Sequence, residues 1–186
     1  MITRRRRSRL ILVCTLASAA CHQAARTAAE SPAGAAVVRS ASGMSRGTLR
    51  LEQGAGGVRV SGTLAGLPAG VHGVHFHQVG RCDAPDFATA GAHFNPTGAL
   101  HGLDNPLGPH AGDLPNITTT AGGQVAVDVV TMRVTLDASG PRGLFDGDGT
   151  ALVIHAAPDD QRSDPAGNSG ARIACGVVTR ADRVSD

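Results

Sequence analysis

Short runs rich in Val, Leu and Thr recur along this chain from about residue 37 onward, and turn signals that contain glycine separate them. The turns include Gly-Ala-Gly-Gly at 54–57, Ala-Gly-Gly at 121–123 and Asp-Gly-Asp-Gly at 146–149. Apolar runs of this length between such turns predict β-strands. The expected strands are 37–42, 47–52, 57–64, 73–79, 124–130, 133–136, 151–155 and 173–179.

Eight short strands in one domain favour an all-β sandwich or flattened barrel. No segment after about residue 40 has the sustained periodicity of a helix. The interval from about 80 to 117 lacks a convincing strand. A loop of this length is uncommon in a compact domain unless something orders it, and a bound metal ion would do so.

The first 21 residues differ from the rest of the chain. A strongly basic start, an apolar run at 10–17 and small residues before Cys21 are typical of an export signal, and the run is too short for a membrane anchor. A buried N-terminal strand is disfavoured because four consecutive arginines would lie beside it. Cys21 resembles the lipidated cysteine of bacterial lipoproteins, although Ser18 stands where that motif prefers Leu, Val or Ile. We expect an exported protein, either periplasmic or anchored by lipid and facing the periplasm or exterior.

The remaining chain is mildly acidic. Removing the five arginines before Cys21 from the 17 basic residues leaves 12 against 15 acidic ones, a net charge of −3. This balance, without a basic stripe interleaved with aromatic residues, argues against nucleic-acid binding. Membrane contact would come only through a lipid on Cys21. An Ala-rich linker is expected at 22–36, followed by one domain at 37–186.

Three histidines lie within the segment GVHGVHFH at 70–77. Side chains alternate along a strand, so His75 and His77 share one face and His72 points to the other. A lone histidine of this kind is commonly a core residue bonded to the backbone, which is the interpretation we favour for His72. Two histidines on one face, directly before a loop rich in histidine, indicate metal ligands.

Seven side chains are candidate ligands, one fewer than two four-coordinate sites require. The eighth position is either water or a histidine that binds both metals through its two ring nitrogens, and spacing alone leaves both open. An all-imidazole site suits Cu(II), whereas histidines with one carboxylate suit Zn(II). The strand pair with His155 favours copper, and the loop group favours zinc. The candidates are His75, His77, His93, His101, His110, Asp113 and His155.

Two cysteines, Cys82 and Cys175, remain after the N-terminal segment. In an exported domain such a pair predicts one disulfide. Thiolate metal ligation is the disfavoured alternative because no third cysteine is near and the histidines have better spacing.

Five segments in order resemble the copper–zinc superoxide dismutase family of the bacterial secreted type. They are GVHGVHFH, GAHFNP, HAGDLPNI, VIHAAPDD and GNSGARIACGVV, and the similarity extends from about Val37 to Thr179. The resemblance implies an eight-stranded flattened Greek-key β-barrel with long metal-binding and electrostatic loops. It also implies one copper and one zinc ion per subunit.

The resemblance assigns a role to each candidate. Arg172 would lie beside the copper and guide the anionic substrate, and Asp159 would join a copper ligand to a zinc ligand. Cys82 and Cys175 occupy the family's disulfide positions. His93 would bridge the two metals, which supplies the eighth ligand. Copper would take His75, His77, His93 and His155, and zinc would take His93, His101, His110 and Asp113.

The implied activity is dismutation of superoxide to O2 and hydrogen peroxide through alternating Cu(II) and Cu(I), with a structural zinc ion and a proton supplied through His93. A copper-delivery module, or a periplasmic copper- and zinc-binding domain without turnover, is the alternative. A delivery module is disfavoured because all copper positions and Arg172 are kept and no CxxC is present. The segment 161–171 is shorter than in animal members, with Pro165 and Ala166 where those carry Lys and Thr. A second copy of the chain is a candidate partner.

Overall fold

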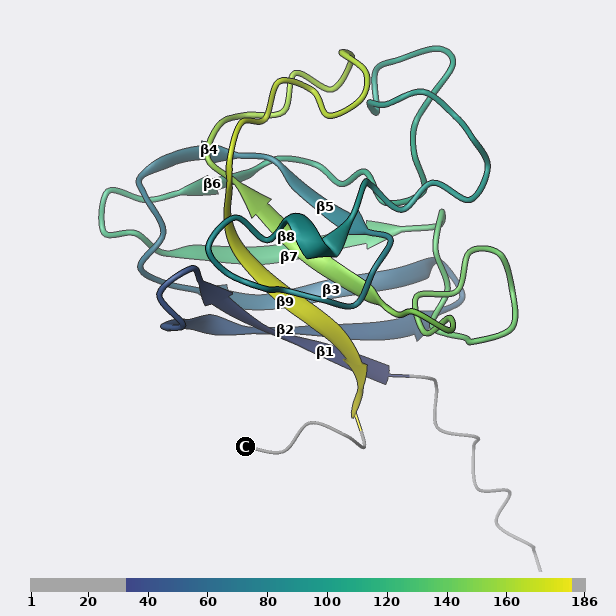
Figure 1. The fold of residues 1–186 in the computed structure, drawn as a ribbon, viewed down its shortest axis with the longest axis horizontal. Helices are drawn as coiled ribbons and strands as arrows, with labels where there is room; N and C mark the ends of the chain where they lie inside the picture. Colours follow the sequence, from purple (N-terminus) through teal and green to yellow (C-terminus); the bar gives the residue numbers. More distant parts are fainter. Residues whose placement is uncertain (1–32, 182–186) are drawn as a thin grey trace, which may run out of the picture. The chain divides into compact units, whose positions relative to one another are not determined.

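The computed structural model describes residues 33–181 and shows an almost entirely β-stranded domain (Figure 1). No helix within this range is long and apolar enough to cross a membrane. The elements are β1 (Ala33–Ser40), β2 (Ser45–Gly54), β3 (Gly57–Leu64), β4 (Gly70–His72), β5 (Val74–His77), the single 3-10 turn η1 (Ala88–Ala90), β6 (Ile117–Thr119), β7 (Val125–Thr131), β8 (Thr150–His155) and β9 (Arg172–Arg180).

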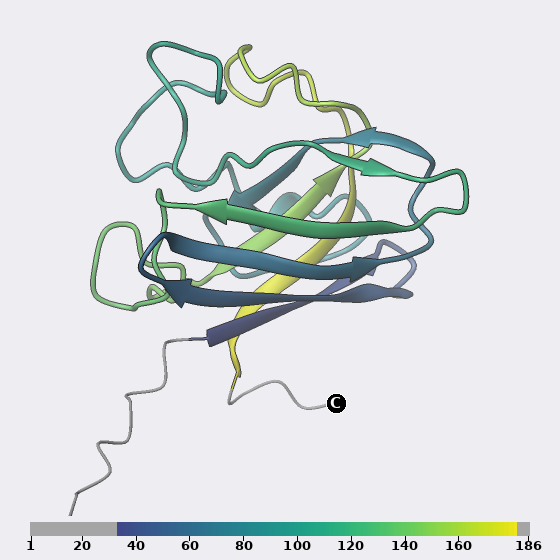
Figure 2. The same ribbon diagram turned by 180° about the vertical axis from the view of Figure 1, so that it is seen from behind.

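Seven strands form one curled antiparallel sheet in the order β5-β8-β9-β1-β2-β3-β7. A second sheet contains only β4 and β6, which pair antiparallel. The strand β4 leads into the edge strand β5 through Gly73, and β6 precedes the opposite edge strand β7. The small sheet therefore brings the two edges of the large sheet towards each other, which closes the flattened barrel expected from the sequence (Figures 1 and 2).

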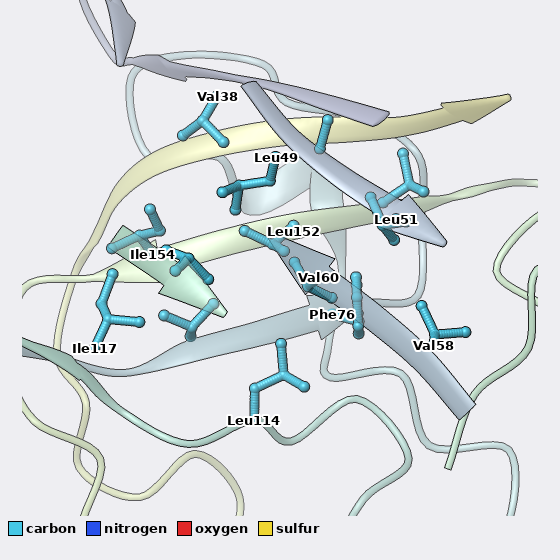
Figure 3. Packing of buried hydrophobic residues seen from close by; sticks show 14 of the residues in the cluster. Val38, Leu49, Leu51, Val58, Val60, Phe76, Leu114, Ile117, Leu152 and Ile154 are labelled. Carbon is cyan, nitrogen blue, oxygen red and sulfur yellow. The ribbon is translucent and has the colours of Figure 1, made fainter. Parts of the chain in front are cut away.

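The main core lies inside this curled sheet, and alternation along the strands fills it. In β2 and β3 the Leu and Val side chains are buried, while the residues on either side of each are more exposed. Figure 3 shows these inward side chains meeting Phe76 of β5 and Leu114 of the long loop. The core is therefore made by both the sheet and the loop that follows β5.

The strand β8 is buried along its whole length. Leu152 and Ile154 enter the main core, whereas Ala151 and Val153 join a second cluster with Phe87 and other residues of the loop around η1. Figure 1 shows this loop crossing β8 and β9. His155, at the end of β8, is buried as well.

Several predicted boundaries need correction. The strand expected at 133–136 is absent: β7 ends at Thr131, and only an isolated bridge joins Thr135 to Gly143. Val134 and Leu136 are nevertheless buried because this loop covers the core, so their alternation imitated a strand. The strand expected at 73–79 ends at His77, and β4 and β6 were not predicted.

The start of the domain also differs from the prediction. β1 begins at Ala33, so the predicted linker 22–36 ends too late. The residues from Ala33 to Ala36 are small, and their backbones pair with β2, with Gly34 to Ala36 also pairing with β9. The predicted export signal at 1–21, with Cys21, lies outside the described residues, as does most of the linker.

Candidate metal centre

The strand β5 carries His75 and His77, and the long loop returns alongside it. Isolated β-bridges pair His75 with Asp113 and His77 with His93. Between them, the Phe76 backbone N–H donates to the Gly112 oxygen at 2.9 Å and the Phe76 oxygen accepts from the Phe94 N–H at 2.8 Å. The loop thus continues the sheet locally, and this backbone pairing brings ligand candidates from distant parts of the sequence together.

Four buried histidines form one group, which we call the four-histidine cluster. One ligand nitrogen from each lies within 4.8 Å of the others. Each ring also has one buried nitrogen that lacks a hydrogen-bond partner within residues 33–181. These atoms are His75 Nδ1, His77 Nε2, His93 Nε2 and His155 Nε2.

The opposite nitrogen of each ring is occupied. His77 Nδ1–H donates to the Gly91 oxygen at 2.9 Å, and His155 Nδ1–H donates to the Gly170 oxygen at 3.1 Å. His75 Nε2 lies 2.6 Å from Asp159 Oδ2. A neutral imidazole has a single N–H, so the nitrogens that face the cluster carry lone pairs. Converging buried lone pairs without a donor fit a metal cation.

Burial keeps three of these imidazoles neutral, those of His75, His77 and His155. It lowers the pKa of His75 to about 4, that of His77 to about 2 and that of His155 to about 3. A neutral ring is the form that ligates a metal. The lone pairs are therefore available at neutral pH.

A second group, the loop cluster, contains His93, His101, His110 and Asp113. Asp113 Oδ1 lies 3.0 Å from His93 Nδ1, 3.1 Å from His101 Nδ1 and 3.4 Å from His110 Nδ1. Ligands about 2.0 Å from a tetrahedral zinc ion would be about 3.3 Å apart. The observed spacing fits that arrangement.

Asp113 is held as an anion. Burial alone would raise its pKa, but hydrogen bonds with His101 and His93 and the Gly102 backbone N–H lower it strongly. Its second oxygen accepts the N–H groups of Gly102 and His110, each at 2.9 Å. The carboxylate therefore has a fixed orientation, with Oδ1 aimed at the three ring nitrogens.

Charge also distinguishes His101 from the other rings. Burial opposes its charged form, but Asp113 and Asp159 outweigh burial and raise the pKa of His101 to about 9. In contrast, burial lowers the pKa of His110. Without a bound cation, a proton on His101 thus balances part of the carboxylate charge.

His75 also approaches the loop cluster, since ligand atoms of His75, His93, His101 and Asp113 lie within 4.8 Å of one another. Its Nε2, however, is bonded to Asp159, and its Nδ1 is one of the four unpartnered nitrogens. His110 Nδ1 lies 3.4 Å from His93 Nδ1. His110 therefore completes the loop cluster better than His75 does.

Asp159 links the two clusters. Its Oδ2 lies 2.6 Å from His75 Nε2 and its Oδ1 lies 3.0 Å from His101 Nε2, with all three side chains buried. Burial would raise its pKa, but the bonds with His101 and His75 lower it. Both rings are thereby oriented by one carboxylate.

Arg172 begins β9, and backbone oxygens hold its guanidinium. It donates to the oxygens of Phe87 and Gly91, both at 2.7 Å. Burial lowers the pKa of the Arg172 guanidinium. An arginine nevertheless stays protonated at neutral pH. The adjacent disulfide between Cys82 and Cys175 is present, as predicted.

His72 lies outside both clusters. Its Nδ1 is 2.8 Å from the His155 oxygen and its Nε2 is 2.9 Å from the Pro68 oxygen. The parity argument from the sequence anticipated this separation. The carbonyl groups of Phe87, Gly91 and Gly170 were not predicted as parts of the site, because a backbone oxygen leaves no side-chain signal in a sequence.

The fold and these clusters define a β-barrel protein with two buried groups of candidate metal ligands that share His93. Residues 45–178 match the family model described as copper/zinc superoxide dismutase. The chain is 51% identical over 133 residues to "Superoxide dismutase [Cu-Zn] 1" of Aquifex aeolicus, covering 71% of this chain and 79% of that protein. It is 41% identical over 145 residues to the corresponding enzyme of Caulobacter vibrioides, covering 77% and 83%.

Solved structures agree with this relationship. A superoxide dismutase-like protein from Bacillus subtilis superposes with a TM-score of 0.75 at 35% identity, covering 78% of this chain and 97% of that one. The Cu/Zn superoxide dismutase from Brucella abortus gives 0.65 at 26% identity, covering 79% and 99%. The chain belongs to the copper/zinc superoxide dismutase family. It is an oxidoreductase that dismutates superoxide and uses one copper and one zinc ion.

Proposed function

We propose that the four-histidine cluster holds the copper ion and that superoxide reacts there. The observation that carries this assignment is the set of four buried ring nitrogens that face one another without a donor. An all-nitrogen set is the chemistry that Cu(II) favours. The bound copper ion supplies the one-electron redox chemistry, and the residues around it bind, orient and protonate the substrate.

The loop cluster takes the zinc ion. Three imidazole nitrogens and one carboxylate oxygen form a donor set typical of zinc. His93 belongs to both clusters, because its Nδ1 faces Asp113 and its Nε2 faces the other three histidines. In this assignment His93 would supply one ring nitrogen to each metal ion, and zinc would have a structural role that fixes the His93 ring.

Two residues act on the substrate. The Arg172 guanidinium, held by two backbone oxygens, offers a positive charge for an anionic substrate. His93 Nε2 is the ring nitrogen that can carry a proton to the reduced substrate. Asp159 is a positioning residue, since it orients His75 and His101 rather than touching the substrate.

The assignment is tested with His155→Ala and His101→Ala in the full chain. Each variant serves as the control for the other, because each removes one buried ring from one cluster. We expect His155→Ala to lose copper and dismutation activity while keeping zinc. We expect His101→Ala to lose zinc before it loses copper. Metal analysis and the superoxide decay rate measure both. Copper retained at wild-type stoichiometry in His155→Ala would overturn the copper ligand set.

The alternative function is metal binding or copper delivery without turnover. Relatives named as superoxide dismutases, similar over most of the chain, favour the enzyme. Full copper and zinc occupancy in the wild-type chain without decay of superoxide would favour the alternative.

We also propose that residues 1–21 direct export to the periplasm and that Cys21 receives a lipid. The disulfide supports an oxidising compartment, because such bonds persist there and are rare in the cytosol. Mass spectrometry of the protein from membrane and periplasmic fractions tests both parts. A mature chain that begins at Cys21 with an added acyl mass supports lipidation, and an uncleaved chain in the cytosol contradicts export. Sedimentation of the same sample tests whether a second copy is a partner.

A further inference from the structure

The zinc ligands differ in what their outer ring nitrogens contact. At His75, His77, His101 and His155, the ring nitrogen that points away from the metal positions contacts a backbone oxygen or Asp159. His93 turns both nitrogens to the metal positions. His110 Nε2 instead faces Asp164 Oδ1 at 3.7 Å. Asp164 lies in the shortened segment 161–171, outside the ligand motifs identified in the sequence.

The same oxygen of Asp164 contacts a second zinc ligand. Asp164 Oδ1 accepts the His101 backbone N–H at 2.8 Å. The carboxylate thus lies between His101 and His110, which are buried, while its own side chain is 46% exposed.

The backbone around Asp164 is held against the zinc loop. The Gln161 oxygen accepts the Asp104 N–H at 3.0 Å, and the Arg162 oxygen accepts Asn105 Nδ2–H at 3.2 Å. Gly102, with φ of +107°, allows this approach, since an added Cβ would lie 2.1 Å from the Gln161 oxygen. Figures 1 and 2 both show the two loops side by side at one end of the barrel. These contacts place Asp164 beside the zinc position.

We infer that Asp164 is a positioning residue for the zinc half of the site, serving His110 as Asp159 serves His101. This inference rests on the proposed zinc ligand set. When His110 Nδ1 binds a cation, the single proton of the ring must be on Nε2, which faces Asp164. The 3.7 Å separation is longer than a hydrogen bond, so the contact in this structure is electrostatic. A dication on the ring makes the Nε2–H a stronger donor and increases its attraction to the carboxylate.

The test uses Asp164→Asn, which keeps an oxygen for the His101 N–H and removes only the charge. Asp160→Asn is the matched control: it makes the same charge change in the same segment, but the Asp160 carboxylate accepts from Arg162, Ser163 and Asn168 and from neither zinc ligand. Zinc affinity is measured in the full chain by competition with a chromogenic chelator. We expect Asp164→Asn to weaken zinc binding roughly 10- to 100-fold, and Asp160→Asn to stay near the wild-type value.

A second measurement separates positioning from general stability. Co(II) bound at the zinc position reports ligand geometry through its visible absorption bands. We expect the bands to shift in Asp164→Asn and not in Asp160→Asn. The two variants should have similar free energies of unfolding when metal-free. Wild-type affinity and bands in Asp164→Asn would overturn the inference, as would equal losses in both variants.

His110→Ala distinguishes failure of the inference from failure of the ligand assignment. If His110→Ala loses zinc and Asp164→Asn keeps the wild-type zinc affinity, the ligand set stands and only the role of Asp164 is refuted. Zinc retained at full affinity in His110→Ala would remove the proposed ligand set and the inference with it.

Discussion

His77 and Arg172 donate hydrogen bonds to the same backbone oxygen, that of Gly91, at 2.9 Å and 2.7 Å. One peptide group therefore orients a copper-ligand candidate and holds the guanidinium beside it. The loop around η1 supplies this group, and the disulfide at Cys82 ties the start of that loop to β9. In the proposed assignment, ligand orientation and substrate attraction thus depend on one short stretch of backbone.

This relationship predicts the effect of Arg172→Ala. The variant removes the charge that is proposed to attract superoxide, and the His77 bond to Gly91 remains. We expect the second-order rate of dismutation to fall roughly tenfold, within the range that electrostatic steering supplies. Copper content should not change. The rate should also decline less with added salt than in the wild type, because screening acts on the lost attraction.

Arg50→Ala is the control, since it removes the same charge from an exposed position on β2, and β9 and β1 lie between that strand and β8. Pulse radiolysis or a stopped-flow assay at several ionic strengths gives both rates. An equal fall in the two variants would show that net charge rather than the position of Arg172 governs the rate.

A glycine near Asp159 gives a second prediction. Gly167 has φ of +61°, and an added Cβ would lie 1.8 Å from Asp159 Oδ1 and 2.7 Å from His101 Nε2. Gly167→Ala should displace the Asp159 carboxylate, so that zinc affinity falls roughly 10- to 100-fold, as for loss of an outer hydrogen-bond partner. Chelator competition measures the loss.

Gly98→Ala separates this effect from backbone strain. Gly98 has a similar φ of +66°, and nothing lies within 4 Å of an added Cβ. Both variants should lose roughly 1–2 kcal/mol of folding free energy from the left-handed conformation. Equal zinc affinities in the two variants would contradict the role given to Asp159.

The disulfide gives a third prediction. Cys82 and Cys175 are 93 residues apart in sequence, and closing a loop of that length in the unfolded chain stabilises the fold by about 4–5 kcal/mol on the chain-entropy account. Replacing both cysteines by serine should lower the free energy of unfolding in urea by about that amount. The wild type under reducing conditions should give the same value. A loss near zero in both experiments would show that the packing of Phe87 and Ala90 alone holds this loop.

The sequence predicted the fold class and most strands because alternation and turn glycines are local signals. It also pointed to the residues that the structure gathers into the two clusters, since two histidines on one face of an apolar strand are unusual enough to be noticed. Their roles as ligands stay a proposal. Local signals failed at Val134 and Leu136, where a loop that covers the core has the same alternation as a strand.

Other parts of the site could not be predicted from residue types. The oxygens of Gly91 and Gly170 orient two histidines, but any residue has such an oxygen. The same holds for the oxygen of Phe87 that anchors Arg172. The position of Asp164 beside the candidate zinc ligands could not be predicted, because an acidic residue in a polar loop is ordinarily solvated. Only the pairing of that loop with the segment at 101–105 brings it to the zinc ligands.

The buried histidines predict how stability depends on pH once both metals are removed. His75, His77 and His155 have pKa values of about 4, 2 and 3, below the 6.5 of an exposed histidine. Below pH 6.5 the unfolded chain binds a proton at each of these positions, whereas the folded chain does not until its own pKa is reached. The free energy of unfolding should therefore fall on acidification, by about 1.4 kcal/mol per pH unit for each histidine.

His101 acts in the opposite direction, because its pKa is raised to about 9. Its contribution is fully present below pH 6.5 and is lost as the pH rises through 9. The metal-free protein should thus be most stable near pH 6.5, with a steeper decline on the acid side, where four buried histidines with lowered pKa values act together: His75, His77, His110 and His155. Urea unfolding between pH 4.5 and 9 checks this, and His155→Gln should reduce the acid slope by roughly a quarter to a third, since it removes one of these groups. A curve that stays flat from pH 6.5 to 4.5 would mean that these rings are hydrated enough to protonate in the folded state, and the argument for permanently neutral copper ligands would fail with it.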